Sequence, residues 1–233
     1  LFEVFMKKKS FFLICLYILL ISVNSFSQEF SLFKFKPANS LENETKNSPF
    51  TVDLLTDSIL LSTSLSLNVL NLSLDKFTDI KTKVKIDPLP YNSDLINKFD
   101  SLLFNPYSEK LDKTGDIFLV SSALFACSSV LLAPKGNLLT NTLMLAETFL
   151  LANGIKDTLK LIVNRPRPYM YFENPPQEDL IDGDWCCSWP SGHTTLAFTA
   201  ASFASYTFWK NYPKSPWRFA VTAVSFSLAT TTG

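Results

Sequence analysis

Lys160-Leu-Ile-Val-Asn-Arg165-Pro166-Arg167-Pro168 and Trp189-Pro190-Ser191-Gly192-His193-Thr194-Thr195 are the two segments that decide how this chain folds. In the first, an apolar helix has to end, because each Pro lacks an N–H donor and pushes the residue before it out of the helical region. In the second, a helix is expected to begin at Ser191 or Gly192, because Ser is favoured just before a helix. We therefore expect three fixed positive charges at one helix end and the only His of the chain at the start of another helix.

The three charges of the first segment belong to Lys160, Arg165 and Arg167. Arg presents a planar fork of donors that matches phosphate oxygens, and Lys adds a compact point charge. The Pro after each Arg stiffens the backbone, so the guanidinium groups are aimed at a low cost in entropy. The same residues also fit a Lys that reaches from a buried helix to solvent, followed by a solvated Arg-Pro loop.

Ser191, Gly192 and His193 form the start of the second helix. The first N–H groups of a helix have no partners within the helix, and together with the helix dipole they make an anion site. Gly192 lets an anion approach the backbone closely, and the imidazole of His193 is suited to donate a proton near neutral pH. The alternative interpretation is an ordinary capped helix whose His faces solvent.

Taken together, the two segments resemble a known family. Lys160, then six residues, then Arg167-Pro168, followed later by Pro-Ser-Gly-His at 190–193, is similar to the first two signature motifs of the type-2 phosphatidic acid phosphatase and vanadium haloperoxidase superfamily. The specific match runs from Lys160 to His193, and we expect the resemblance to extend from Asp53 to the C-terminus. The resemblance implies an all-α helical bundle of the type-2 phosphatidic acid phosphatase kind, with several transmembrane helices.

The resemblance also implies an activity, which is hydrolysis of a phosphomonoester or diphosphate through a phospho-histidine intermediate, without a metal. Lys160 and Arg167 would hold phosphoryl oxygens, and Ser191 Oγ and the Gly192 N–H would donate further hydrogen bonds. His193 would be the catalytic acid that protonates the departing oxygen. Arg165 is a second-rank phosphate-binding candidate, for a second phosphate or a lipid head group.

One departure from the family pattern concerns the third motif, which supplies an Arg, a nucleophilic His and an Asp that orients this His. The present sequence contains a single His, and it stops at Gly233 inside the helix after which that motif is expected. We therefore expect a C-terminally truncated member that lacks the nucleophile, binds phosphate weakly and turns over poorly, although a full-length parent would be active. Two alternatives remain: a haloperoxidase-like protein with vanadate as its cofactor, and a catalytically inactive helical envelope protein.

The composition of the chain argues against two other classes of function, nucleic-acid binding and metal binding. The chain has 233 residues, 47% of them hydrophobic, and its 21 basic residues balance its 21 acidic ones. Because there is no basic stripe and no excess of positive charge, we expect no nucleic-acid partner. The spacing of the four Cys and the single His does not match a metal site, so we expect no metal and no cofactor.

The N-terminal part reads as a targeting segment. Residues 1–27 comprise upstream residues and a secretory signal peptide that starts at Met6, with three Lys, an apolar stretch and small residues before a cleavage site. Residues 28–52 are rich in Ser, Asn, Lys and Pro and are expected to form a linker. Residues 53–233 would form the helical domain. We expect export into the envelope of a bacterium.

Further helices are expected at 53–74, 117–133, 138–163, 196–209 and 217–232, with one or two short ones within 92–112. The alternation at Leu65, Leu67 and Val69 would also suit a strand.

If 117–133 and 138–163 cross the inner membrane and 53–74 does not, the phosphate site faces the periplasm and Lys135, Lys210, Lys214 and Arg218 lie in the cytoplasm. A soluble bundle is the alternative, because several runs are shorter than about 20 residues. The expected partner is a phosphorylated lipid or a small phosphate ester, and the sequence leaves the oligomeric state open.

Overall fold

Six α-helices and no strand make up the ordered elements of the residues that the computed structural model describes, which are 49–77, 90–91, 96, 101, 104–134 and 137–232. The predicted signal peptide, most of the predicted linker and Lys135 lie outside the described residues. The α-helices are α3 (Leu54–Phe77), α4 (Glu109–Leu131), α5 (Leu138–Val163), α6 (Gln177–Asp182), α7 (Gly192–Asn211) and α8 (Trp217–Thr232). Two short 3-10 helices, η4 (Pro168–Tyr171) and η5 (Asp184–Cys186), flank α6. The predicted all-α fold is confirmed for the described residues.

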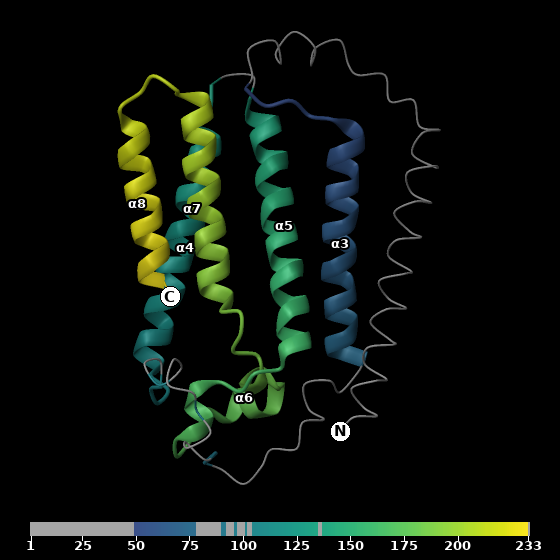
Figure 1. Cartoon of the computed structure of the whole chain (residues 1–233), viewed down its shortest axis with the longest axis vertical. Coiled ribbons are helices and arrows are strands. Elements are labelled where there is room, and N and C mark those ends of the chain that lie inside the picture. Colours follow the sequence, from purple (N-terminus) through teal and green to yellow (C-terminus); the bar gives the residue numbers. More distant parts are fainter. Residues whose placement is uncertain are drawn as a thin grey trace.

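The long helices run side by side, and the connection from α5 to α7, which includes α6, closes one end of the bundle (Figure 1). The chain passes down α5, through this connection, and back up α7. As a result, the last turn of α5 and the first turn of α7 lie at the same end of the bundle. These two turns carry the segments that the sequence singled out.

Most helix bounds follow the sequence, and the expected start of one long helix was wrong. The segment around Leu65 is helical within α3, so the strand alternative is excluded. Helix α4 begins at Glu109 rather than Ile117, after Ser108 in an extended conformation. Glu109 and Asp112 fall in its first turn, where negative charge interacts favourably with the helix dipole. The one or two short helices expected within 92–112 fall largely outside the described residues, and 109–112 belong to α4.

Small residues let α4, α7 and α8 approach one another closely. Two clusters of buried side chains consist mainly of Ala, with Val130 and Phe203 as the larger members: they contain Ala126, Ala200, Ala197, Ala201 and Ala229. Hydroxyl pairs bridge the same helices, with Ser129 Oγ 3.3 Å from Thr207 Oγ1 and Ser205 Oγ 2.9 Å from Ser225 Oγ. Close packing and hydroxyl contacts of this kind suit helices that associate without a large apolar core between them.

Helix α3 packs against α5 through Asn side chains. Asn68 Nδ2 donates to the carbonyl of Leu150 and Asn71 Nδ2 to that of Gly154, each at 2.8 Å. Asn153 Nδ2 in turn donates to Asn68 Oδ1 at 2.7 Å. Gly154 makes this approach possible, because a Cβ at that position would lie 2.9 Å from the Cβ of Leu67. These contacts therefore fix how far α3 can shift along α5.

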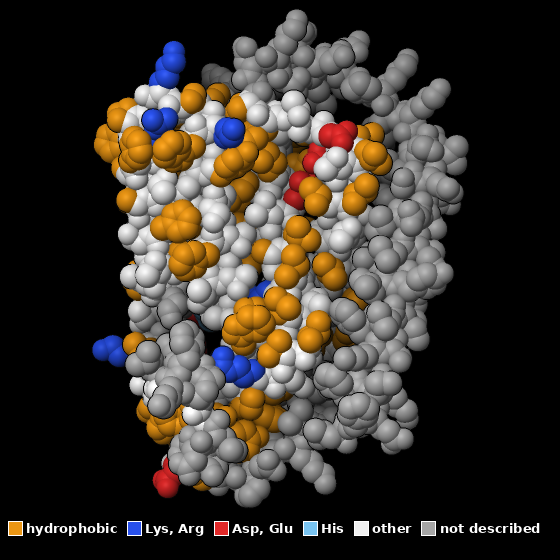
Figure 2. Space-filling view, in the orientation of Figure 1, with side chains coloured by type: hydrophobic (Ala, Val, Ile, Leu, Met, Phe, Trp, Pro, Cys, Tyr) orange, Lys and Arg blue, Asp and Glu red, His pale blue; other side chains and the backbone are white. Residues whose placement is uncertain are grey.

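Much of the outer surface is apolar. Figure 2 shows hydrophobic side chains over much of the visible face, with Lys and Arg gathered where α7 joins α8. Two stretches, Glu109–Leu131 and Leu138–Tyr171, are long and apolar enough to cross a membrane, and 22% of each apolar window is buried inside the protein. The core helix of a soluble protein would be mostly buried. These two helices therefore indicate membrane association, although two such helices are weak support.

A third buried cluster lies in the connection between α5 and α7. It consists of Tyr169, Met170, Trp185, Cys186 and Cys187, none of which is more than 6% exposed. The Sγ atoms of Cys186 and Cys187 lie 3.1 and 3.9 Å from the carbonyl of Gly183. This cluster gives the connection a core of its own, on which the two motif segments rest.

Candidate active site

The two motif segments are joined directly by backbone hydrogen bonds. The Arg167 N–H donates to the carbonyl of Trp185 at 2.7 Å, and the Ser188 N–H donates to the carbonyl of Arg165 at 3.1 Å. Residues 165–167 and 185–188 therefore lie side by side, although η4 and α6 separate them in the sequence. This pairing brings the end of α5 and the start of α7 to one place.

Helix α5 ends at the position that the Pro residues predicted. Asn164 adopts the left-handed conformation, with φ 52° and ψ 46°, and its N–H donates to the carbonyl of Lys160 at 3.0 Å. Asn is one of the few residues that takes up this conformation readily, and it commonly closes a helix there. Lys160 therefore sits in the last turn of α5, beside the paired segments.

Helix α7 begins with the predicted cap. Ser191 is the N-cap, and its Oγ accepts hydrogen bonds from the N–H and the hydroxyl of Thr194, at 3.4 and 3.0 Å. Because Ser191 Oγ accepts in both contacts, its own hydrogen can be donated to a ligand. Gly192 follows, and the Lys160 ammonium lies 3.6 Å from where a Cβ of Gly192 would be. The ammonium thus lies next to the first turn of α7.

Five of the six predicted site residues line one pocket of about 610 Å³. They are Lys160, Arg167, Ser191, Gly192 and His193. This volume is within the range of small-molecule sites. The lining also holds Lys156 and the carboxylates of Asp112 and Asp184, so that three cationic side chains face the same space as two carboxylates. Arg165, the sixth residue, is not part of this lining.

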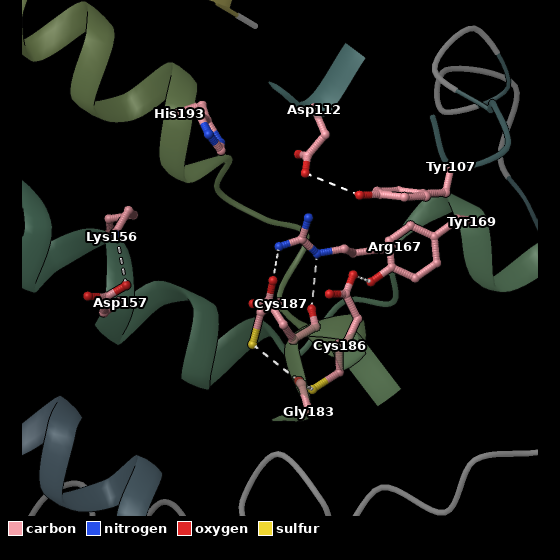
Figure 3. Close-up of polar contacts among 12 residues, drawn as sticks. Tyr107, Asp112, Lys156, Asp157, Arg167, Tyr169, Gly183, Cys186, Cys187 and His193 are labelled. Carbon is pink, nitrogen blue, oxygen red and sulfur yellow. Dashed lines mark hydrogen bonds and ion pairs between the residues drawn. The ribbon is translucent and has the colours of Figure 1, made fainter. Parts of the chain in front are cut away.

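Arg167 is held in place by one partner. Its Nε donates to the backbone carbonyl of Asp184 at 3.0 Å, and its terminal nitrogen Nη2 pairs with the Asp184 carboxylate. The side chains are 31% and 40% exposed, so the pair lies at the edge of the pocket. In Figure 3 the Arg167 guanidinium, held by these bonds, lies across from His193 and Lys156, which project from two different helices. Asp184 therefore fixes the direction in which the guanidinium points.

His193 contacts a carboxylate that the sequence analysis did not identify. Its Nε2 lies 2.7 Å from Oδ1 of Asp116, on α4. The two side chains are 38% and 61% exposed, so the pair is open to the pocket and to solvent. A carboxylate at this distance fixes the orientation of the imidazole ring.

Tyr107 and Asp112 form the wall of the pocket near the start of α4. The hydroxyl of Tyr107 donates to Asp112 Oδ2 at 3.3 Å. Burial, followed by the charge of Asp112, raises the pKa of Tyr107 above its ordinary value, so the phenol remains a donor. Tyr107 also packs edge-on against Tyr169, at 5.9 Å between ring centroids.

The sequence analysis missed Asp116, Asp184 and Lys156. Lys156 lies one helical turn before Lys160, so helical periodicity alone could have placed it on the same face of α5. Asp116 carried no such signal, because it is far from His193 in the sequence and on another helix. Asp184 could be placed only once residues 165–167 were known to pair with 185–188. Among the described residues, no three His, Cys, Asp or Glu side chains are grouped as a metal site requires.

The comparison with protein families gives one match. Residues 141–233 match the family model described as PAP2 superfamily. This range includes both motif segments and confirms the resemblance that they indicated. No curated protein sequence and no solved structure matches the chain. The family match supports a phosphatase-like function in general.

Proposed function

We propose, from the match of residues 141–233 to the PAP2 superfamily, that this chain is a phosphatase-type hydrolase of a phosphomonoester or diphosphate. The observation that carries the proposal is that Lys160, Arg167, Ser191, Gly192 and His193 line one pocket. These are the residue types that bind a phosphoryl group and protonate its leaving oxygen. They reach the pocket from two segments that the backbone pairs directly.

Lys160 and Arg167 bind the phosphoryl oxygens in this scheme. The Arg167 fork and the Lys160 ammonium neutralise negative charge, and the first N–H groups of α7 add donors that need no reorientation. Ser191 Oγ donates one further hydrogen bond. Because Asp184 already holds Arg167, the guanidinium does not need to be ordered when the phosphate arrives.

His193 acts as the general acid. With Nε2 on Asp116, the second ring nitrogen, Nδ1, is the one left to give its proton to the substrate. Water attacks the phosphorus, the bond between phosphorus and the leaving oxygen breaks, and the proton from His193 goes to that oxygen, so an alcohol or a singly protonated phosphate departs. Asp116 orients the ring for the transfer.

The attacking group of the family scheme is a second His, and these 233 residues contain one. Because His193 has the role of the acid, we expect the chain to bind phosphate and to hydrolyse esters slowly. Hydrolysis by this chain that is unchanged in His193→Ala would contradict the assignment of His193.

We further propose that the substrate is lipid-linked and that the bundle lies in a membrane, with its pocket facing the periplasm. The apolar outer faces of α4 and α5 support an embedded bundle. Lys210, Lys214 and Arg218 lie at or near the far end of α7 from the pocket, where the positive-inside rule would put the cytoplasm. A pocket at one end of the bundle is also within reach of a lipid head group.

A binding measurement tests the proposal without relying on turnover. We expect Lys160→Met to weaken binding of inorganic phosphate about 10- to 100-fold, the loss typical of hydrogen bonds to a charged group. Arg165→Met is the matched control, because it removes a neighbouring positive charge that does not line the pocket. Isothermal titration with phosphate, or with vanadate as its analogue, gives both affinities. Equal losses in the two variants would show only a general effect of charge and would contradict the proposed site.

A further inference from the structure

Lys156 is a cation that the proposed reaction has not used. It lies one turn before Lys160 on α5, and both side chains line the pocket. A Cβ on Gly192 would lie 3.6 Å from the Lys160 ammonium and 3.9 Å from that of Lys156. Two ammonium groups therefore meet at the first turn of α7.

The Lys156 side chain is held in place. It is only 11% exposed, and its Nζ lies 2.9 Å from Oδ1 of Asp157. The other oxygen of Asp157 accepts a hydrogen bond from Asn153 Nδ2 at 3.0 Å, so the carboxylate is itself fixed. Asp157 is 34% exposed, so the carboxylate lies nearer to solvent than the ammonium does, and Lys156 keeps further N–H donors beyond the one directed at Asp157.

One phosphoryl group does not require this third cation. Lys160, Arg167, Ser191 and the start of α7 already supply donors for its oxygens. A diphosphate carries a second phosphoryl group with its own negative charge, which needs a second set of donors. In the lining of the pocket, Lys156 is the remaining cationic side chain.

We infer that Lys156 binds the second phosphoryl group of a diphosphate and makes the pocket selective for diphosphates over phosphomonoesters. This inference rests on the proposed function, because it assumes that Lys160 and Arg167 bind the first phosphoryl group. It narrows the substrate to the diphosphate class. The leaving group is then a phosphate, and it receives the proton of His193.

The experiment compares the binding of inorganic diphosphate and inorganic phosphate to the whole chain by isothermal titration. We expect Lys156→Gln to weaken diphosphate binding about 10-fold or more, while phosphate binding stays within about 3-fold. Lys113→Gln is the matched control, because Lys113 also pairs with a carboxylate, Glu109, but is 70% exposed and outside the pocket lining. Lys156→Arg keeps the charge and is expected to keep the preference for diphosphate.

Asp157→Asn provides a test with the opposite sign. The Asn keeps an oxygen that can accept a hydrogen bond from Lys156, but it removes the negative charge beside the ammonium. The affinity for diphosphate is therefore expected to rise several-fold, and to rise by a larger factor than the affinity for phosphate. This variant keeps the inference testable if Lys156→Gln does not fold, which circular dichroism would reveal. Diphosphate and phosphate binding that change equally in both Lys156→Gln and Asp157→Asn, or do not change, would overturn the inference. Failure of the unmodified chain to bind either ion would overturn the proposed function as well.

Discussion

At the scale of single residues, substitution of Asp116 tests whether His193 acts as the general acid. We expect Asp116→Asn to slow hydrolysis of an alkyl phosphate about 10-fold or more, because the imidazole of His193 loses the carboxylate that orients it as the proton donor. Hydrolysis of p-nitrophenyl phosphate should change less than about 2-fold, because its leaving group departs without a proton. Release of inorganic phosphate, followed over long incubations, measures both rates.

Asp112→Asn is the control for this comparison. Asp112 lies one turn earlier on α4, lines the same pocket and accepts a hydrogen bond from Tyr107 rather than from His193. It should slow the two esters to the same extent. If Asp116→Asn also slowed both esters equally, Asp116 would serve the structure of the pocket and not proton transfer.

The site residues that could be predicted from the sequence all lie at helix ends, whereas the site residues that were not predicted do not share a local signal. Lys160, Arg167 and Ser191 through His193 lie beside helix ends, and Pro, Asn and Ser mark those ends locally. Asp116 and Asp184 act through contacts that depend on how helices and loops are arranged, which no local pattern encodes. The direction of the Arg167 side chain was therefore beyond sequence reasoning, although its presence in the site was not.

At the scale of helices, two Gly residues in helix interiors give opposite expectations. Gly154→Ala should lower the free energy of unfolding by about 1–3 kcal/mol, because its Cβ would lie 2.9 Å from Leu67 Cβ across the α3–α5 contact. Gly115→Ala meets nothing closer than 3.7 Å and should be neutral or stabilise the protein by up to about 1 kcal/mol. Thermal unfolding of the purified chain in one detergent measures both. Equal destabilisation would show that α3 and α5 are not packed through Gly154.

Helix bounds were predicted best where a strong stop is present. Helices α5 and α8 have the expected bounds, since Pro residues and loops limit them. The start of α4 was placed too late, because apolar periodicity begins at Ile117 whereas the helix begins in the charged turn at Glu109. Charged first turns are stabilised by capping and by the helix dipole, and a search for apolar periodicity does not detect them.

At the scale of the whole molecule, α4 carries an exposed apolar face. Its side chains recur at helical spacing and are exposed along the helix: Ile117, Val120, Leu124, Cys127 and Leu131. In water such a stripe would be costly, whereas in lipid it is the expected outer surface. Whether the bundle is embedded can therefore be tested on this face.

Two substitutions of exposed Leu residues on α4 make this test. Leu124→Lys, in the apolar stretch, should cost about 2.5–3.5 kcal/mol for a charge in the bilayer and reduce the protein retained in carbonate-washed membranes. Leu111→Lys, in the charged first turns, should leave retention unchanged. A soluble bundle would tolerate both, because an exposed Lys typically changes stability by less than about 0.5 kcal/mol.

The pairing of residues 165–167 with 185–188 has a consequence for how this molecule can be redesigned. Because the segment between these paired residues begins and ends at the same place, its length does not depend on the distance between the long helices. Residues 171–182 can therefore be exchanged as a unit while the paired ends stay joined, provided that Met170 and Gly183 keep their contacts with the buried cluster. Residues 171–182 are not part of the pocket lining, so such an exchange leaves the proposed site and the long helices unchanged.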